Sequence, residues 1–191
     1  MMDSVTRWAM AQREIGLTVG EPPVVKGYPP SVFALMPKLM EKSGTSNKGT
    51  VTAFYTVLVD GDDVNEPIAN AARGIPDGHI WLSRKLANQN HFPAIDVLGS
   101  ISRLMSALAT PEHRQAASDL RDVMETYRAS EDLISIGVYQ PGANQNLDRA
   151  VAMMPYVKEL LCQASDETTT LDDAVQGLLA LFGQSPDGAA A

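Results

Sequence analysis

The segment TVTAFYTVLV at residues 50–59 constrains the fold of this chain more than any other feature, because it is a nearly uninterrupted run of apolar and β-branched residues. A strand with one face in water alternates apolar and polar side chains, whereas a strand covered on both faces stays apolar. The run therefore predicts a strand buried on both faces, in a central and largely parallel sheet. Elsewhere the hydrophobic period switches between about 3.6 and about 2, which indicates an α/β protein that ends in helices.

Two helices are expected ahead of this strand. The first covers residues 4–16 and closes at Gly16. The second covers residues 31–43, with apolar side chains on one face and Ser31 as its N-cap. Pro37 lacks a backbone hydrogen-bond donor, so we expect it to bend or locally break the second helix.

Shorter elements follow the apolar run. The segment GHIWL at residues 78–82 is expected to form a strand, and SRKLANQ at residues 83–89 a short helix capped by Ser83. From Pro111 onward the pattern is helical, and the three expected helical segments are residues 111–137, 146–163 and 170–183. The chain therefore reads as the later part of an α/β sheet domain at residues 1–109, a helical domain at residues 110–183 and a disordered tail at residues 184–191.

The stretch SGTSNKGT at residues 43–50 places two glycines around a lysine and raises the question of a phosphate-binding loop. Such a loop reads G-x-x-x-x-G-K-[ST] and lies between a strand and a helix, so that its lysine and the helix N-terminus face the anion. Here Lys48 precedes the second glycine, Gly49, and the helix pattern comes before the strand pattern. The order favours a turn between a helix and a strand, with Gly44 as the C′ residue of the helix.

Charge and cysteine content exclude several function classes. The formal net charge of −8 argues against nucleic acid as a main partner, because phosphate binding needs clustered lysine and arginine. The single cysteine, Cys162, rules out an internal disulfide and any multi-cysteine metal site, which fits a reducing cytosol. No run of about 18 apolar residues is present, so no membrane-spanning segment is expected.

Several stretches resemble the C-terminal half of the flagellar and type III secretion export ATPases, which are related to the catalytic and noncatalytic subunits of the rotary ATP synthase head. They are MMDSVTRWAMAQREIGL, GEPPVVKGYPPSVFALMPKLMEKSG, GTVTAFYTVLVDGDDVNEPIANAARGIPDGHIWLSRKLA and HFPAIDVLGSISRLM. The resemblance runs from Met1 to about Gln163. It implies an α/β fold in which the C-terminal part of a RecA-like P-loop NTPase sheet domain is followed by an all-helical C-terminal domain.

The resemblance also assigns roles near the first residues. MMDS looks like the end of the Walker B strand, so Asp3 would be the carboxylate that helps to hold Mg²⁺ beside the phosphates of ATP. Without the resemblance, Asp3 would be read as the cap of the helix that starts at Ser4 or Val5. Arg7 lies one helical turn on and matches an arginine near the γ-phosphate, although an ordinary surface arginine is an equal reading. The P-loop of the family would lie upstream, so we expect the chain to be a fragment.

Five further positions match the nucleotide site of the family. Arg103, in GSISRLM, matches the arginine finger that reaches the nucleotide of a neighbouring subunit, and it would offset charge on the transferring phosphoryl group. Phe92, in NHFPAID, matches an aromatic side chain that stacks against adenine, although it could equally fill a core. The stretch LLCQ falls where the helical domain supplies the other side of the adenine pocket, which points to Leu160, Cys162 and Gln163. None of the three histidines is read as a ligand or a base.

The resemblance implies a cytoplasmic ATPase, peripheral at the inner-membrane export apparatus, that hydrolyses MgATP in a homohexameric ring to release and unfold export substrates. Its implied partners are other copies of itself, a coiled-coil central stalk protein, a regulatory binding protein, complexes of export substrates with chaperones, and the membrane export gate. The alternatives are a rotary ATP synthase subunit, a hexameric nucleic-acid translocase, which the acidic charge balance disfavours, and a short non-catalytic binding module of an ATPase ring. The segment GVYQPGANQN at residues 137–146 disfavours the rotary subunit, which carries an acidic loop there. The residues do not decide between a flagellum and an injectisome.

Overall fold

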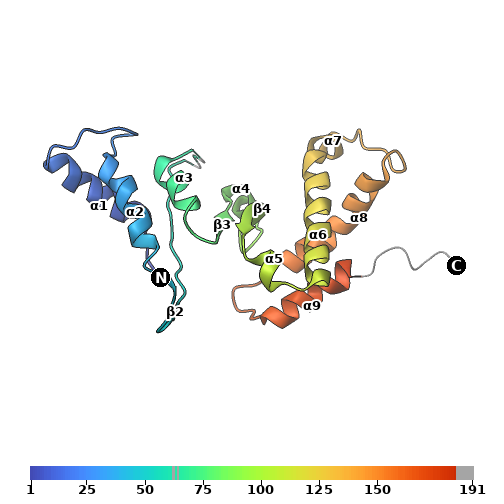
Figure 1. Ribbon diagram of the computed structural model, residues 1–191. Coiled ribbons are helices and arrows are strands. Elements are labelled where there is room, and N and C mark those ends of the chain that lie inside the picture. The colour runs from blue at the N-terminus through green and yellow to red at the C-terminus, as the bar shows by residue number, and fades with distance from the viewer. Residues whose placement is uncertain (62, 64, 184–191) are drawn as a thin grey trace. The chain divides into compact units, whose positions relative to one another are not determined.

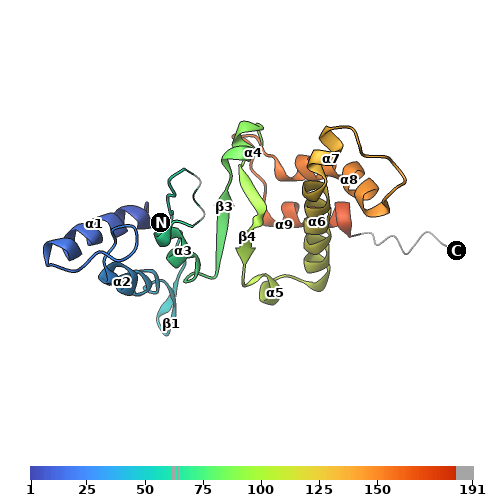
Figure 2. The same ribbon diagram turned by 90° about the horizontal axis from the view of Figure 1, so that it is seen from above.

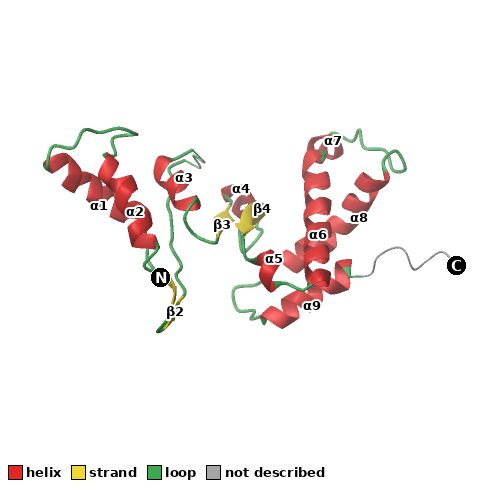
Figure 3. Cartoon of the chain, in the orientation of Figure 1, coloured by secondary structure: helices red, strands yellow, loops and turns green. Residues whose placement is uncertain are grey.

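The computed structural model describes residues 1–61, 63 and 65–183, so the expected tail at residues 184–191 lies outside the described residues. The chain divides into two compact units, Met1–Asp77 and Gly78–Ala191, which are named unit 1 and unit 2. Figure 1 shows the elements along the chain, and Figure 3 colours them by type. Unit 1 contains α1 (Val5–Thr18), α2 (Pro30–Met40), β1 (Gly44–Ser46), β2 (Gly49–Val51) and α3 (Pro67–Arg73).

Helix α1 begins where expected but extends past the predicted end. The side chain of Ser4 is the N-cap and accepts a hydrogen bond from the backbone N–H of Arg7 at 3.3 Å. Gly16 does not close the helix, which continues to Thr18. A Cβ at Gly16 would lie 2.7 Å from Cγ of Pro29, so this glycine allows the helix to pack closely against the start of α2.

Helix α2 also differs from the prediction at its start. It begins at Pro30, and Ser31 is therefore inside the helix, so the prediction that Ser31 is the N-cap was wrong. A proline suits the first helical position because its missing N–H would have no helical partner there. The backbone N–H of Ser31 instead donates to the carboxylate of Glu21 at 3.1 Å. Pro37 lies inside the helix and does not end it.

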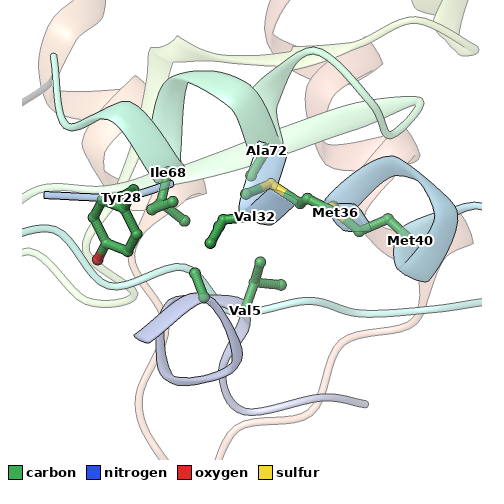
Figure 4. Packing of buried hydrophobic residues seen from close by; sticks show 8 residues of the cluster. Val5, Tyr28, Val32, Met36, Met40, Ile68 and Ala72 are labelled. Atoms are coloured by element: carbon green, nitrogen blue, oxygen red, sulfur yellow. The ribbon is translucent and has the colours of Figure 1, made fainter. Parts of the chain in front are cut away.

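The core of unit 1 lies where α1, α2 and α3 meet (Figure 4). Val5 comes from α1 and Ile68 from α3, and both are fully buried. Apolar residues recur along α2 with helical spacing, and Val32, Met36 and Met40 are its buried face. This helical face was expected from the sequence.

The structure does not confirm the predicted surroundings of the apolar run at residues 50–59, a largely parallel sheet that buries it on both faces. Among the described residues, both named sheets are two-stranded and antiparallel, and parallel pairing is limited to the isolated bridge between Met2 and Tyr55. The run is extended, but Phe54 is 65% exposed and Leu58 is 52% exposed. An apolar sequence makes a strand fit for burial, but the burial itself requires neighbouring strands and helices. The described residues do not form a largely parallel sheet around the run.

The stretch SGTSNKGT forms a β-hairpin rather than a turn between a helix and a strand. Strand β1 pairs with β2 in the register Gly44↔Val51 and Ser46↔Gly49. Helix α2 ends at Met40, so Gly44 is not its C′ residue. Gly44 and Gly49 have φ values of +131° and +142°, a backbone region that favours glycine.

Unit 2 opens with two antiparallel strands that are joined through a short helix and followed by further helices, as Figure 2 shows. Its elements are β3 (Gly78–Leu82), α4 (Arg84–Asn88), β4 (Ile95–Ser102), α5 (Met105–Leu108), α6 (Pro111–Ala129), α7 (Glu131–Ser135), α8 (Gln145–Leu161) and α9 (Leu171–Phe182). Strands β3 and β4 pair antiparallel, with a register shift between His79 and Trp81. The predicted strand at residues 78–82 is confirmed, and so is Ser83 as the cap of α4, since its side chain accepts from the N–H of Leu86.

The helical region has its own core, to which α6, α8 and α9 all contribute. Buried residues of α6 pack with those of α8 and α9, and the set comprises Ala116, Leu120, Val123, Ala150, Val157 and Phe182. The single helix expected at residues 111–137 is divided at Ser130 into α6 and α7. None of the described helices combines the length and the apolar character that crossing a membrane requires.

Candidate functional site

The predicted site residues fall into both compact units. Asp3 and Arg7 belong to unit 1, and Phe92, Arg103 and the residues around Cys162 belong to unit 2.

Asp3 lies just before helix α1, next to the extended apolar run. The hydroxyl of Thr56 donates a hydrogen bond to Oδ1 of Asp3 at 2.7 Å. The capping role belongs to Ser4, so the alternative reading of Asp3 as the helix cap does not hold. Thr56 was not singled out from the sequence, where nothing distinguishes it from Thr50 and Thr52 of the same run.

The donor set around Asp3 fits a magnesium ion only in part. The described residues contain no group of three or more His, Cys, Asp or Glu side chains placed to hold a metal. Mg²⁺ in ATPase sites takes one or two carboxylates and completes its shell with phosphate oxygens and water. The exposed carboxylate of Asp3 is suited to be one such ligand.

Arg7 does not stand one helical turn from Asp3. Asp3 precedes the N-cap, which has extended backbone angles (φ −137°, ψ 161°), so the expected helical spacing does not apply. The side chain of Arg7 lines a cavity of about 400 Å³. The polar lining of that cavity also includes Asp60 and Glu66.

Phe92, Cys162 and Gln163 are brought together in unit 2. They line a cavity of about 420 Å³ with Asn90, Ala164 and Ser165. The backbone N–H of Gln163 donates to the carbonyl of Phe92 at 2.8 Å, which ties the end of α8 to the loop before β4. Phe92 is half exposed, so the reading of this ring as core filler loses support, and one face of the cavity is aromatic. A cavity with an aromatic side chain and backbone polar groups can take a flat heterocycle.

Leu160 does not line this cavity. Its side chain packs in the helical core, where its Cδ1 would lie 3.0 Å from a Cβ added to Gly177 in α9. Leu160 lies one residue before the end of α8 at Leu161, so its side chain belongs to the apolar face that packs in the helical core. Cys162 and Gln163 lie past that end and are free to face the cavity.

Two residues beside this cavity were missed. Asn90 lines the cavity, and Nδ1 of His91 lies 3.3 Å from Sγ of Cys162. Both precede Phe92 directly in NHFPAID, so an aromatic residue singled out in a loop could have drawn attention to its polar neighbours.

Arg103 lies in the turn between β4 and α5, and its side chain is exposed. Within the described ranges, the side chain of Arg103 has no hydrogen bond or ion pair. An exposed guanidinium without a partner in its own unit can reach a phosphate or a carboxylate supplied from elsewhere.

Two family models match consecutive parts of the chain. The nucleotide-binding domain of the ATP synthase alpha/beta family matches residues 1–102. The C-terminal domain of the type III secretion system ATPase EscN matches residues 109–180.

Relatives and solved structures agree with both matches. A flagellum-specific ATP synthase of Bacillus subtilis is 55% identical over 183 residues, which are 96% of this chain and 42% of that protein. The assembled ATPase EscN of the enteropathogenic Escherichia coli type III secretion system has a TM-score of 0.92 and 43% identity, over 95% of this chain and 44% of that chain. EscN in complex with its central stalk EscO has a TM-score of 0.85 and 42% identity, over 95% of this chain and 43% of that chain.

The chain spans about two fifths of the length of the curated relatives it matches. The likeness to EscN shows the expected fold class, part of a RecA-like sheet domain followed by an all-helical domain. The match at residues 1–102, more than half of the chain, shows that this protein belongs to the ATP synthase alpha/beta family, in the branch that also carries the type III secretion ATPase C-terminal domain.

Proposed function

We propose that this chain is part of the ATPase that energises type III protein export, in flagellar assembly or in an injectisome. The observation that carries the proposal is the succession of the two family matches, because the second match is to a domain of secretion ATPases. This succession also disfavours the rotary ATP synthase subunit as an alternative. The protein would hydrolyse MgATP in a homohexameric ring and couple hydrolysis to the release and unfolding of export substrates.

The residues of the chain would share the chemistry as follows. Phe92 would stack on the adenine while Cys162 and Gln163 border its edge. Asp3 would supply a carboxylate to Mg²⁺, which offsets negative charge on the phosphates when bound. Arg103 would extend to the nucleotide of a neighbouring subunit and stabilise charge on the transferring phosphoryl group. Arg7 would lie near the γ-phosphate.

The partners follow from the same proposal. EscN is an assembled ATPase and is known in complex with its central stalk EscO, which supports a ring of identical copies around a coiled-coil stalk. A regulatory binding protein, complexes of substrates with chaperones, and the export gate would be further partners. The protein would work in the cytoplasm, at the inner-membrane export apparatus.

A chimera tests the proposal. The matched segment of the Bacillus subtilis relative is replaced by residues 1–183 of this chain, and MgATP hydrolysis is measured. We expect turnover comparable with that of the relative, because the two are 55% identical across the exchange. Arg103→Ala should lower kcat by on the order of 10³ with little change in KM, the scale of an arginine finger. Phe92→Ala should instead raise KM for ATP by about tenfold, the scale of lost base stacking.

A folded chimera that joins the ring but does not hydrolyse ATP would favour the non-catalytic binding module. Full activity in the Arg103→Ala chimera would contradict the assigned role of that arginine. The 191-residue chain alone is expected to show no turnover, because none of its residues match a phosphate-cradling loop.

A further inference from the structure

The turn that carries Arg103 is held on both sides by side chains of one helix, α6. Strand β4 ends at Ser102 and α5 begins at Met105, so Arg103 and Leu104 form the whole connection. Because the Arg103 side chain has no partner within the described ranges, its direction depends on how firmly the backbone of this turn is fixed.

Arg121 holds the segment before the turn. Its Nη1 donates to the carbonyl of Ser100 at 3.4 Å, and its Nη2 donates to the carbonyl of Leu98 at 3.3 Å. Both carbonyls lie in the middle of β4, in the stretch between Asp96 and Ile101 where the register with β3 shifts. A planar guanidinium can serve two acceptors at once, which a lysine ammonium does less rigidly.

Arg114 holds the segment after the turn. Its Nη1 donates to the carbonyls of Ser106 and Ala109, both at 2.9 Å. Helix α5 has four residues, so its last carbonyls have no partners within the helix. Arg114 satisfies two acceptors that would otherwise depend on water.

The two arginines lie seven positions apart on α6, which is about two helical turns, and so they share one face. The opposite face carries Ala116, Leu120 and Val123, which are buried in the helical core. Helix α6 is therefore anchored in the core on one side and holds the Arg103 turn on the other.

We propose that Arg114 and Arg121 are positioning residues for Arg103, which fix the turn from both sides and so direct the Arg103 side chain out of its own unit. This rests on the proposed function, in which Arg103 acts on a neighbouring nucleotide. A displacement of about 1 Å at a catalytic group can cost about a hundredfold in rate, so an effect through position alone is large enough to measure.

The first experiment measures hydrogen exchange in the 191-residue chain and does not depend on activity. Arg114→Gln and Arg121→Gln should each speed exchange in the peptide that covers residues 103–109 by at least about fivefold, because the turn opens locally without these bonds. Arg128→Gln is the matched control, since Arg128 lies on the same helix but pairs with Glu125 at 2.6 Å. Unchanged exchange in both variants would overturn the proposal.

The second experiment measures the kinetics of the chimera. Arg121→Gln should lower kcat by about tenfold or more and leave KM for ATP within about twofold. In an Arg103→Ala background, Arg121→Gln should have no further effect, because a positioning residue acts only through the group it positions. Arg121→Lys should recover less than half of the lost rate, and circular dichroism checks that each variant folds.

An equal loss in both backgrounds would overturn the proposal, because it would indicate a general structural role. If the unsubstituted chimera does not hydrolyse ATP, the proposed function fails, whereas the exchange measurement still decides whether α6 holds the turn.

Discussion

The apolar run at residues 50–59 and helix α6 are both regular in sequence, yet only α6 is packed as its pattern indicates. Leu120 and Val123 of α6 are 5% and 4% exposed, whereas Phe54 and Leu58 of the run are 65% and 52% exposed. A helix satisfies its backbone hydrogen bonds internally and needs only a neighbouring apolar face. A strand needs partners for its backbone as well as for both faces. A helical pattern therefore needs only a facing apolar surface to be buried, which α8 and α9 provide for α6, whereas a strand pattern also needs neighbouring strands and cover on both faces.

The largest expected effect tests this difference in burial. Leu120→Ala should lower the free energy of unfolding of unit 2 by about 2–4 kcal/mol, because it leaves a cavity in the helical core. Phe54→Ala should change the stability of unit 1 by less than about 0.5 kcal/mol, as for other exposed positions. Urea unfolding followed by circular dichroism measures the first, and hydrogen exchange of α1 the second. A loss of about 2 kcal/mol in Phe54→Ala would contradict the exposed position of the run.

A smaller effect on the free energy of unfolding is expected when two helical glycines are substituted, Gly16 in unit 1 and Gly177 in unit 2. A Cβ at Gly16 would lie 2.7 Å from Cγ of the rigid Pro29 ring, whereas a Cβ at Gly177 would meet the flexible end of Leu160 at 3.0 Å. Alanine improves helix propensity by about 1 kcal/mol at either site, and overpacking costs about 1–3 kcal/mol. Gly16→Ala should therefore destabilise unit 1, and Gly177→Ala should be neutral or stabilising in unit 2. The melting temperatures of both variants test this difference. Equal changes would show that the Pro29 ring moves to accommodate the added methyl group.

The smallest effects concern a surface carboxylate in unit 1. Nζ of Lys26 donates to Asp63 at 2.6 Å, and this bond, followed by the N–H of Asn65, lowers the pKa of Asp63 from its ordinary 3.8. A lowered pKa stabilises the folded state above pH 3.8, and the contribution is lost as the pH falls through the lowered value. An NMR titration should show this low pKa, and Lys26→Met should move it back toward 3.8. An unchanged pKa of Asp63 in Lys26→Met would show that groups other than Lys26 lower this pKa.

The pKa of a surface phenol in unit 2, that of Tyr139, is raised rather than lowered. The hydroxyl of Tyr139 donates to Asp148 at 2.5 Å, and this bond raises the pKa of Tyr139 above its ordinary 10.0. Its contribution is present below pH 10.0 and lost as the pH rises through the raised value. An NMR titration of the Tyr139 ring should show the shift, and Asp148→Asn should reduce it. A pKa of Tyr139 at its ordinary 10.0 in the unsubstituted chain would contradict the hydrogen bond.

Local signals in the sequence predicted much of the helical structure. Ser83 caps α4, and α6, α8 and α9 overlap the segments where the apolar spacing predicted helices, since both signals act within a few residues. Gly16, Ser31 and Gly44 were assigned to helix ends, and all three assignments failed. Pro30 takes the first helical position ahead of Ser31, Gly44 pairs with Val51 in a hairpin, and α1 continues past Gly16, which lies close to Pro29.

The candidate site also depends on contacts that the residues alone could not indicate. The residues themselves could not indicate that Phe92 meets Cys162 and Gln163, which lie about 70 positions away; the family resemblance supplied that grouping, and the structure brings these three residues together around one cavity. The partners of the Arg103 turn, Arg114 and Arg121, were not predicted, because two surface arginines on a polar helix face have no distinctive pattern. Their bonds go to backbone carbonyls, which a sequence does not mark.

The extended run has one further consequence, for handling the protein. One of its edges is satisfied: Met2 and Val5 bond to the backbone at residues 54 and 56, and the Thr6 hydroxyl both donates to and accepts from Leu58. Within the described ranges, the backbone groups of Tyr55 and Val57 on the other edge have no such bonds. An open edge of β-branched and aromatic residues is a template for pairing with another copy. Solubility of the isolated chain should therefore depend on its net charge of −8, and should fall as the pH is lowered or salt is added.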